Sequence, residues 1–495
     1  MRRSDSSRCK TNRVPRSPAS RGISRRECLT AFLPIALSPL RTSLAAPARP
    51  NVLFIMIDTL RADHVGCYGY GKPTTPNLDR LAREGVCFAN FHAASPWTMP
   101  SLMTMFTSLH PCVHGATSVE RRASLKVVTI AERLKALGYS RTVGIVSNPV
   151  ANARYGFAQG FDLYDDYTIS FTHELNLFEA DGAGRPKGIH ECVTSHTVTR
   201  MANEWLAKEG RNGPWFLFLL YFDPHNSYVP PPPWHRKFDP HPDDESRKHP
   251  IDPYRLPPKE KAGEYREHVM ALYDGEVGYT DHWLGQLLAN LDKLGLRDNT
   301  LVLVVSDHGE EFLYHGGALH GRTLYNELTR GVLMLRLPGK LPAGRAVNAP
   351  VCHLDIPPTI LECIGEKPDS ECQGAGCLRL IVDTAPTRPG SKDRPCFLEG
   401  CTKQALRAVV LDRHKLILDT DSRQEELYDL ESDPGEKANI AAKQPDITAR
   451  LRGVLNTHIA ECAEAAKKYQ IEGDAARPKL TRQDVEALRQ LGYLQ

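Results

Sequence analysis

Acidic and imidazole side chains follow three apolar stretches, at the point where each stretch ends. They are Asp58 after residues 51–57, Asp223 with His225 after 215–222, and Asp307 with His308 after 300–306. Continuous apolar runs of this length are typical of strands in a parallel sheet buried on both faces. The carboxyl ends of such strands share one edge of the sheet, where open α/β folds bind ligands. Carboxylates combined with imidazole bind divalent cations, so the pattern predicts a metal site at that edge.

Residues 95–115 place a hydroxyl group where it could react. Pro100 suits the first turn of a helix, and apolar residues recur at helical spacing over 102–109. Thr98 is therefore expected just before a helix N-terminus, where free N–H groups favour an anion. A hydroxyl beside a metal at that place is a candidate nucleophile toward an esterified phosphate or sulfate. Taken alone, a simple helix cap is the commoner role for a Thr at such a place.

Two polar residues that follow expected strands could have a structural role instead of a role in a site. Asn148 follows an expected strand at 140–146, so its amide could hydrogen-bond a substrate oxygen at the sheet edge. Asn is also a common turn residue, and Asp58 could merely cap the turn after its own strand. Both alternatives stay open at this level.

Helices are expected between the strands, which gives an α/β chain with a mostly parallel sheet. The expected helices are 75–84, 127–137, 194–208 and 264–294, and a further strand lies near 332–337. From about residue 386 the pattern changes to a small antiparallel sheet, with strands at 406–418 and 426–430, followed by a helix at 447–468. A Pro-rich polar loop at 230–257 is a candidate rim of the active site.

Composition excludes several classes of protein. The 495 residues are 41% hydrophobic and 24% charged, as in ordinary globular proteins, and suffice for a large core. The net charge of +3 is too small to indicate nucleic-acid binding, and much of the positive excess lies in the first 50 residues. Among the 13 cysteines no Cys-x-x-Cys pair has zinc spacing, so no structural zinc is expected, and disulfide pairing cannot be deduced.

The N-terminal segment resembles an export signal. Residues 24–29, Ser-Arg-Arg-Glu-Cys-Leu, resemble a twin-arginine motif, and an apolar run at 29–40 and small residues at 45–48 follow. The run is short and broken by prolines, so no integral membrane association is expected. We expect a periplasmic or secreted protein, with a basic disordered N-terminus as the alternative. The expected parts are a signal at 1–48, a catalytic domain at 49–385, a small C-terminal subdomain at 386–470 and a tail helix at 471–495.

These residues resemble the sulfatase family of the alkaline phosphatase superfamily. The matching segments run nearly the length of the chain after the signal: 51–70, 75–88, 98–115, 160–166, 223–230, 273–285, 306–309, 324–327 and 426–439, with a similar tail at 488–494. The resemblance implies an alkaline-phosphatase-like three-layer sandwich with a mostly parallel central sheet, plus a small C-terminal α+β subdomain.

The sequence differs from that of a typical sulfatase at the position of the nucleophile. Typical members carry Cys-x-Pro-Ser-Arg, whose Cys is oxidised to formylglycine, whereas this chain has Thr-Met-Pro-Ser-Leu at 98–102. Thr cannot become formylglycine, so none is expected. The family's second acid after the first strand is Thr59 here. Phosphodiesterase and phosphoethanolamine-transferase relatives use a Thr nucleophile, which the resemblance then implies for Thr98.

The resemblance also implies the ligands of a divalent metal. Asp58, Asp307 and His308 match family ligands, and Asp223 is an expected further ligand, while His225 and His320 lie where relatives place substrate contacts or a second metal. One site of carboxylates and one imidazole suits Ca, and a second site with the imidazoles favours Zn or Mn.

The resulting hypothesis is an exported, metal-dependent hydrolase of small-molecule or glycan sulfate or phosphate esters. Thr98 attacks sulfur or phosphorus, Asn148 and Arg322 hold the nonbridging oxygens, and His225 or His320 protonates the leaving group. Phosphoester chemistry is favoured by the Thr nucleophile. The alternative is an inactive sulfatase-like protein that binds sulfated or phosphorylated glycans, and a phosphoryl transferase is a third option. The oligomeric state stays open.

Overall fold

The computed structural model describes residues 49–167, 194–244, 256–383, 394–400, 405–470, 476–482, 484, 485 and 488. The expected signal at 1–48 and much of the expected tail helix lie outside these residues. Ala48–Gln495 forms one compact unit by its internal contacts. Within the described part of the chain, no helix has the length and apolar character needed to cross a membrane.

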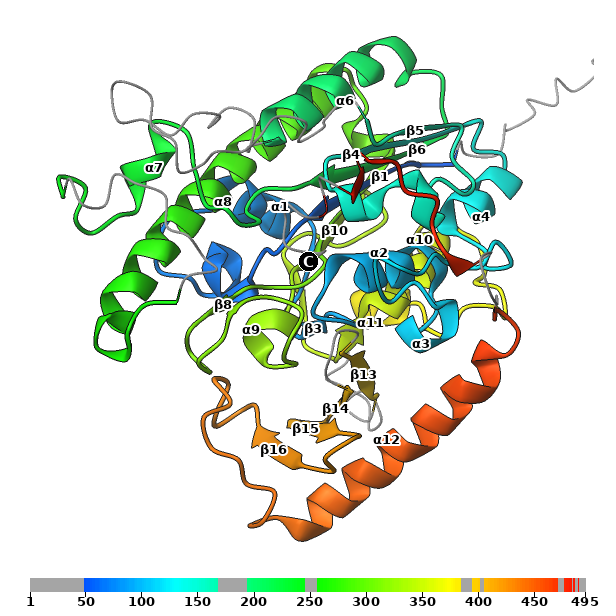
Figure 1. Ribbon diagram of the computed structural model, residues 1–495. Helices are drawn as coiled ribbons and strands as arrows, with labels where there is room; N and C mark the ends of the chain where they lie inside the picture. Colours follow the sequence, from blue (N-terminus) through cyan, green and yellow to red (C-terminus); the bar gives the residue numbers. More distant parts are fainter. Residues whose placement is uncertain are drawn as a thin grey trace, which may run out of the picture. The chain divides into compact units, whose positions relative to one another are not determined.

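A sheet of eight strands forms the centre of this unit (Figure 1). In spatial order the strands are β11 (Arg345–Val347), β2 (Val86–Phe88), β10 (Leu333–Arg336), β7 (Thr300–Ser306), β1 (Asn51–Ile57), β6 (Trp215–Tyr221), β4 (Arg141–Val146) and β5 (Leu163–Asp165). The run from β7 to β5 is parallel. β10 is antiparallel to both of its neighbours. The predicted mostly parallel sheet is therefore confirmed.

The three apolar stretches form the central strands because both faces of the sheet are covered. Every residue of β1, β6 and β7 is buried. Alternate residues of β1 enter different hydrophobic clusters, with Phe54 on one face and Ile55 on the other. A strand between two apolar layers has no polar face, which explains the continuous apolar runs.

Helices form the two outer layers of the sandwich. One face packs against α1 (Pro76–Glu84), α6 (Ser195–Glu209) and α8 (Ala262–Lys293). The other packs against α2 (Thr98–Thr107), α4 (Ile130–Ala136) and α10 (Ile356–Cys363). All of these helices except α10 match predicted ones, and α8 is one continuous helix. α4 begins later than expected because Thr129 and Glu132 form a capping box at its N-terminus.

Several short strands and helices connect the strands and helices of the sandwich. They are β3 (Phe91–His92), β12 (Val351–Cys352), β8 (Glu311–Phe312), β9 (Ala318–Leu319), α3 (Pro111–His114), α7 (Trp234–Lys237), α9 (Asn326–Thr329) and α11 (Leu378–Val382). β5 was not among the predicted strands. α7 lies in the Pro-rich segment that was predicted as a rim, and residues 245–255 of that segment lie outside the described residues.

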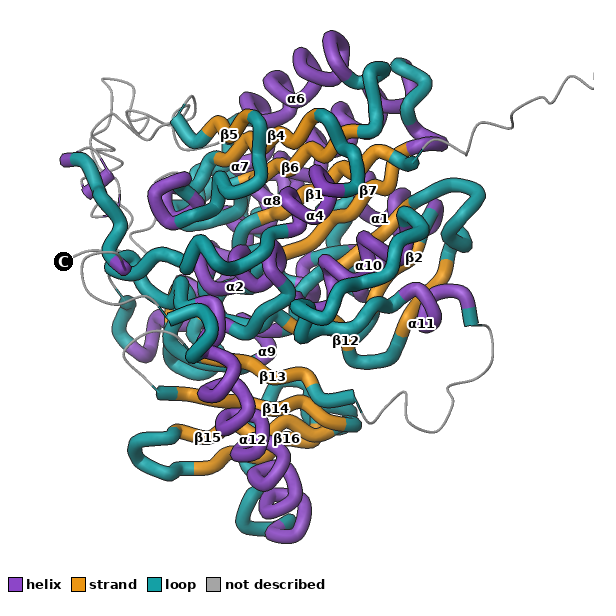
Figure 2. The backbone as a smooth tube through the Cα atoms, turned by 90° about the vertical axis from the view of Figure 1, so that its right-hand side faces the viewer, coloured by secondary structure: helices purple, strands orange, loops and turns teal. Residues whose placement is uncertain are grey.

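A second, antiparallel sheet follows near the C-terminus. Its strands are β13 (Cys396–Glu399), β14 (Leu406–Leu411), β15 (His414–Asp419) and β16 (Glu425–Asp429), in that spatial order. One face packs against Leu451 and Leu455 of α12 (Pro445–Ala466), which crosses the sheet in Figure 2. The other face packs against Ala94 and Leu324 of the larger layer structure. The small sheet and its helix were predicted, and the domain boundaries themselves stay predictions.

The N-terminus of α1 depends on a side chain from another helix. Thr75, the residue before α1, makes no side-chain cap. Asp281 of α8 instead accepts hydrogen bonds from the backbone N–H groups of Asn77 (3.0 Å) and Leu78 (2.8 Å). Removing this carboxylate would leave buried N–H groups unpaired.

We expect Asp281→Ala to lower the free energy of unfolding by about 1–3 kcal/mol, because an interhelical cap is lost. Urea unfolding followed by far-ultraviolet circular dichroism measures this. Asp292→Ala on the same helix is the control, since Asp292 makes an exposed ion pair with Arg297 (3.3 Å) worth less than about 1 kcal/mol. Equal losses in the two variants would contradict the capping role.

Candidate active site

Two carboxylates lie side by side at the ends of neighbouring strands. In the register of β1 and β7, Ile57 is opposite Ser306, so the next residues, Asp58 and Asp307, leave the sheet together. Both side chains are fully buried. The parallel register that the apolar strands impose thus brings the two acids to one edge of the sheet, as predicted.

The backbone fixes one oxygen of Asp307 and leaves the other available. Oδ1 accepts hydrogen bonds from the N–H groups of Thr59 (3.1 Å) and His308 (2.8 Å). Oδ2 is buried without a hydrogen-bond donor among the described residues and lies 3.3 Å from His308 Nε2. The free oxygen therefore faces the imidazole.

The hydrogen bonding of His308 decides which nitrogen faces the acids. Nδ1 lies 2.8 Å from the carbonyl oxygen of Gly309, to which it donates a proton. Burial lowers the pKa of His308 to about 3, so the ring is neutral and Nε2 carries a lone pair. Nε2 also lies 3.8 Å from Asp58 Oδ1. This is the tautomer that a metal ligand requires.

Thr98 is the first residue of α2, one step further into the helix than expected. Its Oγ1 lies 3.2 Å from His308 Nε2 and 3.5 Å from Asp58 Oδ1. The side chain is fully buried. The candidate nucleophile, both acids and one imidazole thus come from three separate segments and meet at one point, beside a helix N-terminus.

The electrostatics of this group favour a cation. Burial raises the pKa of Asp58 well above its usual range, and the neighbouring Asp307 carboxylate raises it further. Burial also raises the pKa of Asp307. One ligand atom from each of Asp58, Asp307 and His308 lies within 4.8 Å of the others. Two carboxylates and one imidazole lone pair fit a divalent metal, which would offset their mutual repulsion.

Asn148 contacts a predicted metal ligand through its side-chain amide. Its Nδ2 donates to Asp58 Oδ2 (2.6 Å), and its Oδ1 accepts from the N–H of Val150 (2.9 Å). The side chain thus combines the turn role with a contact to Asp58. The Nδ2 group has a second N–H, and the role of this amide in holding a substrate oxygen stays a prediction.

Asp223 is used in a different way from the other strand-end acids. Its carboxylate accepts hydrogen bonds from the N–H groups of Thr194 (3.1 Å) and Ser195 (2.8 Å), and also from the Ser195 hydroxyl, at the start of α6. Burial raises its pKa to about 6. The carboxylate thus caps a helix, it lies outside the group formed by Asp58, Asp307 and His308, and its metal role stays a prediction.

The remaining predicted residues lie around the imidazole of His308. The His320 ring packs against His308 and His225, with ring centroids 4.5 Å and 4.9 Å apart. Burial lowers the pKa of His320 to about 3. Arg322 is exposed and lowers that pKa further through its charge. Arg322 makes no hydrogen bond to any residue that the structure describes.

Sequence reasoning missed Glu310. The carboxylate is fully buried and lies 2.9 Å from His320 Nδ1. Burial raises its pKa to about 8. The signal was present in the Asp-His-Gly-Glu run at 307–310, but only the fold places Glu310 beside His320.

Two family models match the chain. One described as Sulfatase matches residues 50–366, and one described as N-sulphoglucosamine sulphohydrolase, C-terminal, matches residues 315–465. The first covers more than half of the chain. The chain belongs to the sulfatase family. The resemblance noted in the sequence is thereby confirmed at the level of the family.

Individual relatives of this sulfatase-family chain span most of its length. It is 25% identical to an N-acetylglucosamine-6-O-sulfatase of Bacteroides thetaiotaomicron, over 84% of this chain and 87% of that protein. A phosphonate monoester hydrolase of Agrobacterium radiobacter matches in structure with a TM-score of 0.66 at 20% identity, covering 84% of this chain and 96% of that one. A protein solved with its substrate D-glucosamine-2-N,6-O-disulfate matches with a TM-score of 0.65 at 21% identity, covering 85% and 98%. These likenesses show the predicted fold, and the chain is a hydrolase of the sulfatase family.

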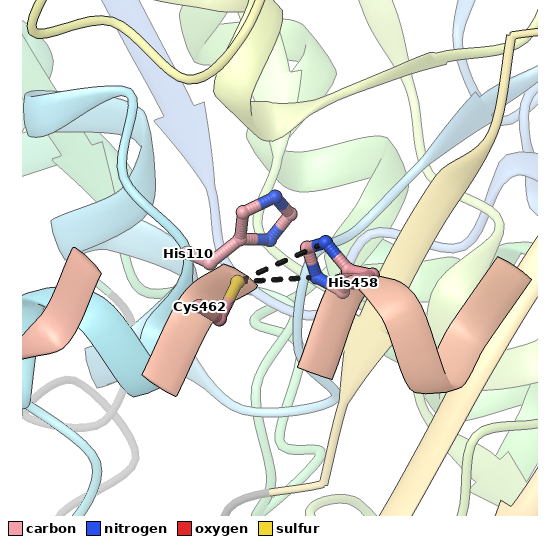
Figure 3. Close-up of side chains that lie close together, drawn as sticks. All are labelled: His110, His458 and Cys462. Carbon is pink, nitrogen blue, oxygen red and sulfur yellow. Dashed lines mark hydrogen bonds between the residues drawn. The ribbon is translucent and has the colours of Figure 1, made fainter. Parts of the chain in front are cut away.

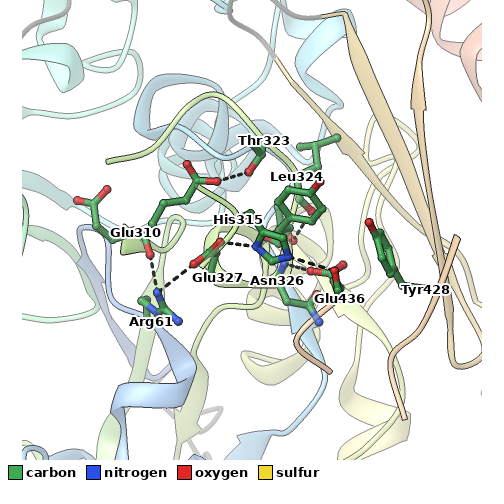
Figure 4. A network of polar contacts seen from close by, with 12 residues as sticks. Arg61, Glu310, His315, Thr323, Leu324, Asn326, Glu327, Tyr428 and Glu436 are labelled. Carbon is green, nitrogen blue, oxygen red and sulfur yellow. Dashed lines mark hydrogen bonds and ion pairs between the residues drawn. The ribbon is translucent and has the colours of Figure 1, made fainter. Parts of the chain in front are cut away.

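A polar network ties the active-site loop of this sulfatase-family chain to its C-terminal sheet (Figure 4). Arg61 donates to the carbonyl oxygen of Glu310 (2.7 Å) and pairs with Glu327 (3.5 Å). Glu327 also binds His315 Nδ1 (2.7 Å), and His315 Nε2 donates to the carbonyl oxygen of Glu436 (3.1 Å). The loop that carries His308 and His320 is therefore held from both sheets.

We expect Asn148→Ala to weaken metal binding about 10–100-fold, because Asp58 loses the donor that orients it. Asn152→Ala is a matched control, since Asn152 caps the next turn through Arg154 N–H (2.9 Å) and makes no contact with Asp58. Equilibrium dialysis with metal analysis measures both variants. Similar affinities in the two would show that Asn148 acts only as a turn residue.

Proposed function

We propose that this chain is a metal-dependent hydrolase of sulfate or phosphate esters in which Thr98 is the nucleophile. The observation that carries the proposal is the contact of Thr98 Oγ1 with His308 Nε2 (3.2 Å), inside the buried group that includes Asp58 and Asp307. A hydroxyl in that place needs no oxidation to react. The proposal includes the assignment of Thr98 to the position that the nucleophilic Cys occupies in typical members of the family.

Asp58, Asp307 and His308 are the residues that would hold the metal. When bound, a divalent cation would lower the pKa of the Thr98 hydroxyl. Its positive charge would also offset the negative charge on the nonbridging oxygens of the ester. The oxygen-rich donor set suits Ca or Mg, and the single imidazole also permits Mn or Zn. Asn148 holds Asp58, and the Thr59 N–H holds Asp307, so both acids are preorganised.

The chemistry proceeds by two displacements at sulfur or phosphorus. Thr98 Oγ loses its proton and forms a bond to that atom while the bond to the leaving-group oxygen breaks, and the leaving oxygen takes up one proton, so the step is balanced. Water then attacks the same atom, the bond from that atom to Thr98 Oγ breaks, and one proton from the water restores the Thr98 hydroxyl. The N-terminus of α2, with its partial positive charge, would stabilise the negative charge of the reacting group. The exposed Arg322 is an approach point for the anionic ester.

His320 is the better candidate for the proton donor. Its Nδ1 faces the Glu310 carboxyl group (2.9 Å), whereas the Nδ1 atoms of His308 and His225 face carbonyl oxygens. A carbonyl oxygen can only accept a hydrogen bond, so Nδ1 of such a ring carries the proton. In the neutral ring Nε2 is then an acceptor. A protonated carboxyl group can donate to Nδ1 and leave Nε2–H as a donor. Glu310 can therefore supply the proton that His320 passes to the leaving group.

The names of relatives bear on the substrate. An N-acetylglucosamine-6-O-sulfatase and a phosphonate monoester hydrolase share this fold and most of its length. We favour a phosphorus ester, because a Thr hydroxyl lacks the second hydroxyl of hydrated formylglycine that helps release sulfate, and a sulfated or phosphorylated glycan remains within the class. Export by the signal at 1–48 is retained as part of the proposal. A non-catalytic glycan-binding protein is the outcome to be tested against it.

Thr98→Ala should reduce hydrolysis of an aryl phosphodiester, phosphate monoester, phosphonate monoester or sulfate by on the order of 10³-fold or more, because the nucleophile is lost. Steady-state rates measured with all four esters identify the preferred class. Thr98→Ser should keep measurable activity. Mass analysis of a quenched reaction should show the phosphoryl or sulfuryl group on the peptide that contains Thr98.

Thr107→Ala provides a matched control on the same helix. Thr107 Oγ1 donates only to the carbonyl oxygen of Met103 (2.7 Å), so its loss should leave turnover near that of the parent chain. Undiminished activity in Thr98→Ala would sink the proposed nucleophile. Metal bound without turnover of any of the four esters would favour the glycan-binding alternative.

His320→Asn should slow alkyl esters far more than nitrophenyl esters, by about 10²-fold against less than about 10-fold, because only the poor leaving group needs a proton. His225→Asn is the matched comparison, and we expect it to lack this dependence on the leaving group. A plot of rate against leaving-group pKa for each variant makes the measurement. The same slope for His320→Asn as for the parent chain would exclude His320 as the acid.

A further inference from the structure

A second cluster of metal-binding residue types lies away from Thr98, where the C-terminal helix meets the rest of the chain (Figure 3). His458 and Cys462 lie four residues apart on α12, and therefore on one face of that helix. His110 immediately precedes α3. All three side chains are buried, with exposed fractions of 7% for His110, 8% for His458 and 2% for Cys462.

The distances within this cluster match one small cation. One ligand atom from each residue lies within 4.8 Å of the others, and Cys462 Sγ is 3.4 Å from His458 Nε2. A tetrahedral metal with bonds of about 2.0 Å to nitrogen and 2.3 Å to sulfur separates such ligands by roughly 3.3–3.7 Å. The His458 ring is also held in place, stacked on Phe397 with centroids 3.6 Å apart and planes 4° apart.

His110 adds an independent observation. Its Nδ1 is buried and makes no hydrogen bond within the described part of the chain. Leaving a buried polar atom unpaired costs about 1–3 kcal/mol, which a metal bond would remove. The carboxylate of Glu399 has Oε1 at 4.0 Å from this nitrogen, which is too far for a hydrogen bond.

The residue types of the cluster decide which ion it would take. One thiolate and two neutral imidazoles supply three ligands of a tetrahedral ion and offset part of its charge inside an apolar surrounding. Thiolate and imidazole together select Zn²⁺ over the hard cations Ca²⁺ and Mg²⁺.

We propose that His110, His458 and Cys462 form a zinc site that fastens α12 to the segment following the nucleophile helix. α2 ends at Thr107, and His110 follows after a turn of two residues. The ion would therefore connect the C-terminal helix to the chain segment that carries Thr98. This site is separate from the proposed function, and a sequence search for closely spaced cysteine pairs does not detect it.

Cobalt substitution of the full chain tests this site directly. With Co²⁺ bound, we expect a thiolate-to-metal charge-transfer band in the near ultraviolet, because the active-site group contains no sulfur. The band should disappear in Cys462→Ser and persist in Asp307→Asn. Zinc content should fall by one equivalent in Cys462→Ser and stay at the parental level in Cys363→Ser, which changes a buried cysteine outside the cluster.

Two results would overturn the proposal, and both are measured on the parent chain. One is Co²⁺ binding without any thiolate band. The other is a disulfide between Cys112 and Cys462 in the metal-free protein as purified, seen as a linked peptide that separates on reduction. Either result stands even where Cys462→Ser fails to fold.

Discussion

Two buried carboxylates side by side are the constraint on which the site depends. Asp58 and Asp307 follow paired strands, so the sheet register alone brings them together. Burial and mutual repulsion disfavour their ionised forms, and each pKa is raised. The protein offsets part of this cost with donors from the backbone and from Asn148. The remaining imbalance is what a bound cation would neutralise.

The backbone beyond β1 is shaped to keep that arrangement rigid. Thr59 has a φ of 50°, in the left-handed region that a β-branched residue rarely adopts. The Tyr273 hydroxyl holds this turn by donating to the Thr59 carbonyl oxygen (2.7 Å) and accepting from the Arg61 N–H (2.8 Å). In this conformation the turn directs the Thr59 N–H to Asp307. A strained residue at the sheet edge is thus maintained by a buried tyrosine from α8.

The sequence was sufficient for those features that depend on local pattern. Apolar runs revealed the central strands, and the position after each strand revealed Asp58 and Asp307. The same rule did not reveal that Asp223 caps a helix, because its partner Thr194 lies in a different segment and nothing local indicates that contact. Glu310 was overlooked for a similar reason, since its importance comes from the distant His320. Tertiary contacts, not residue type, decide between these roles.

The zinc-type cluster illustrates the same limit at longer range. His458 and Cys462 share a helix face, which a sequence can reveal, but neither spacing nor composition indicates His110 as their neighbour. The expectation of no structural zinc rested on cysteine pairs close in sequence. A site assembled from α3 and α12 escapes such a search, because the fold supplies the proximity.

The choice of Thr98 makes the charge balance of the active site more demanding. An alcohol ionises with difficulty, and the negative charges of Asp58 and Asp307 raise the energy of an alkoxide beside them. His308 is neutral in this structure and offsets neither charge. The N-terminus of α2 supplies only a partial positive charge. The described side chains around Thr98 therefore oppose its ionisation unless a cation lies among them, so the proposed chemistry would depend on a metal held by the same carboxylates that make the site costly to bury.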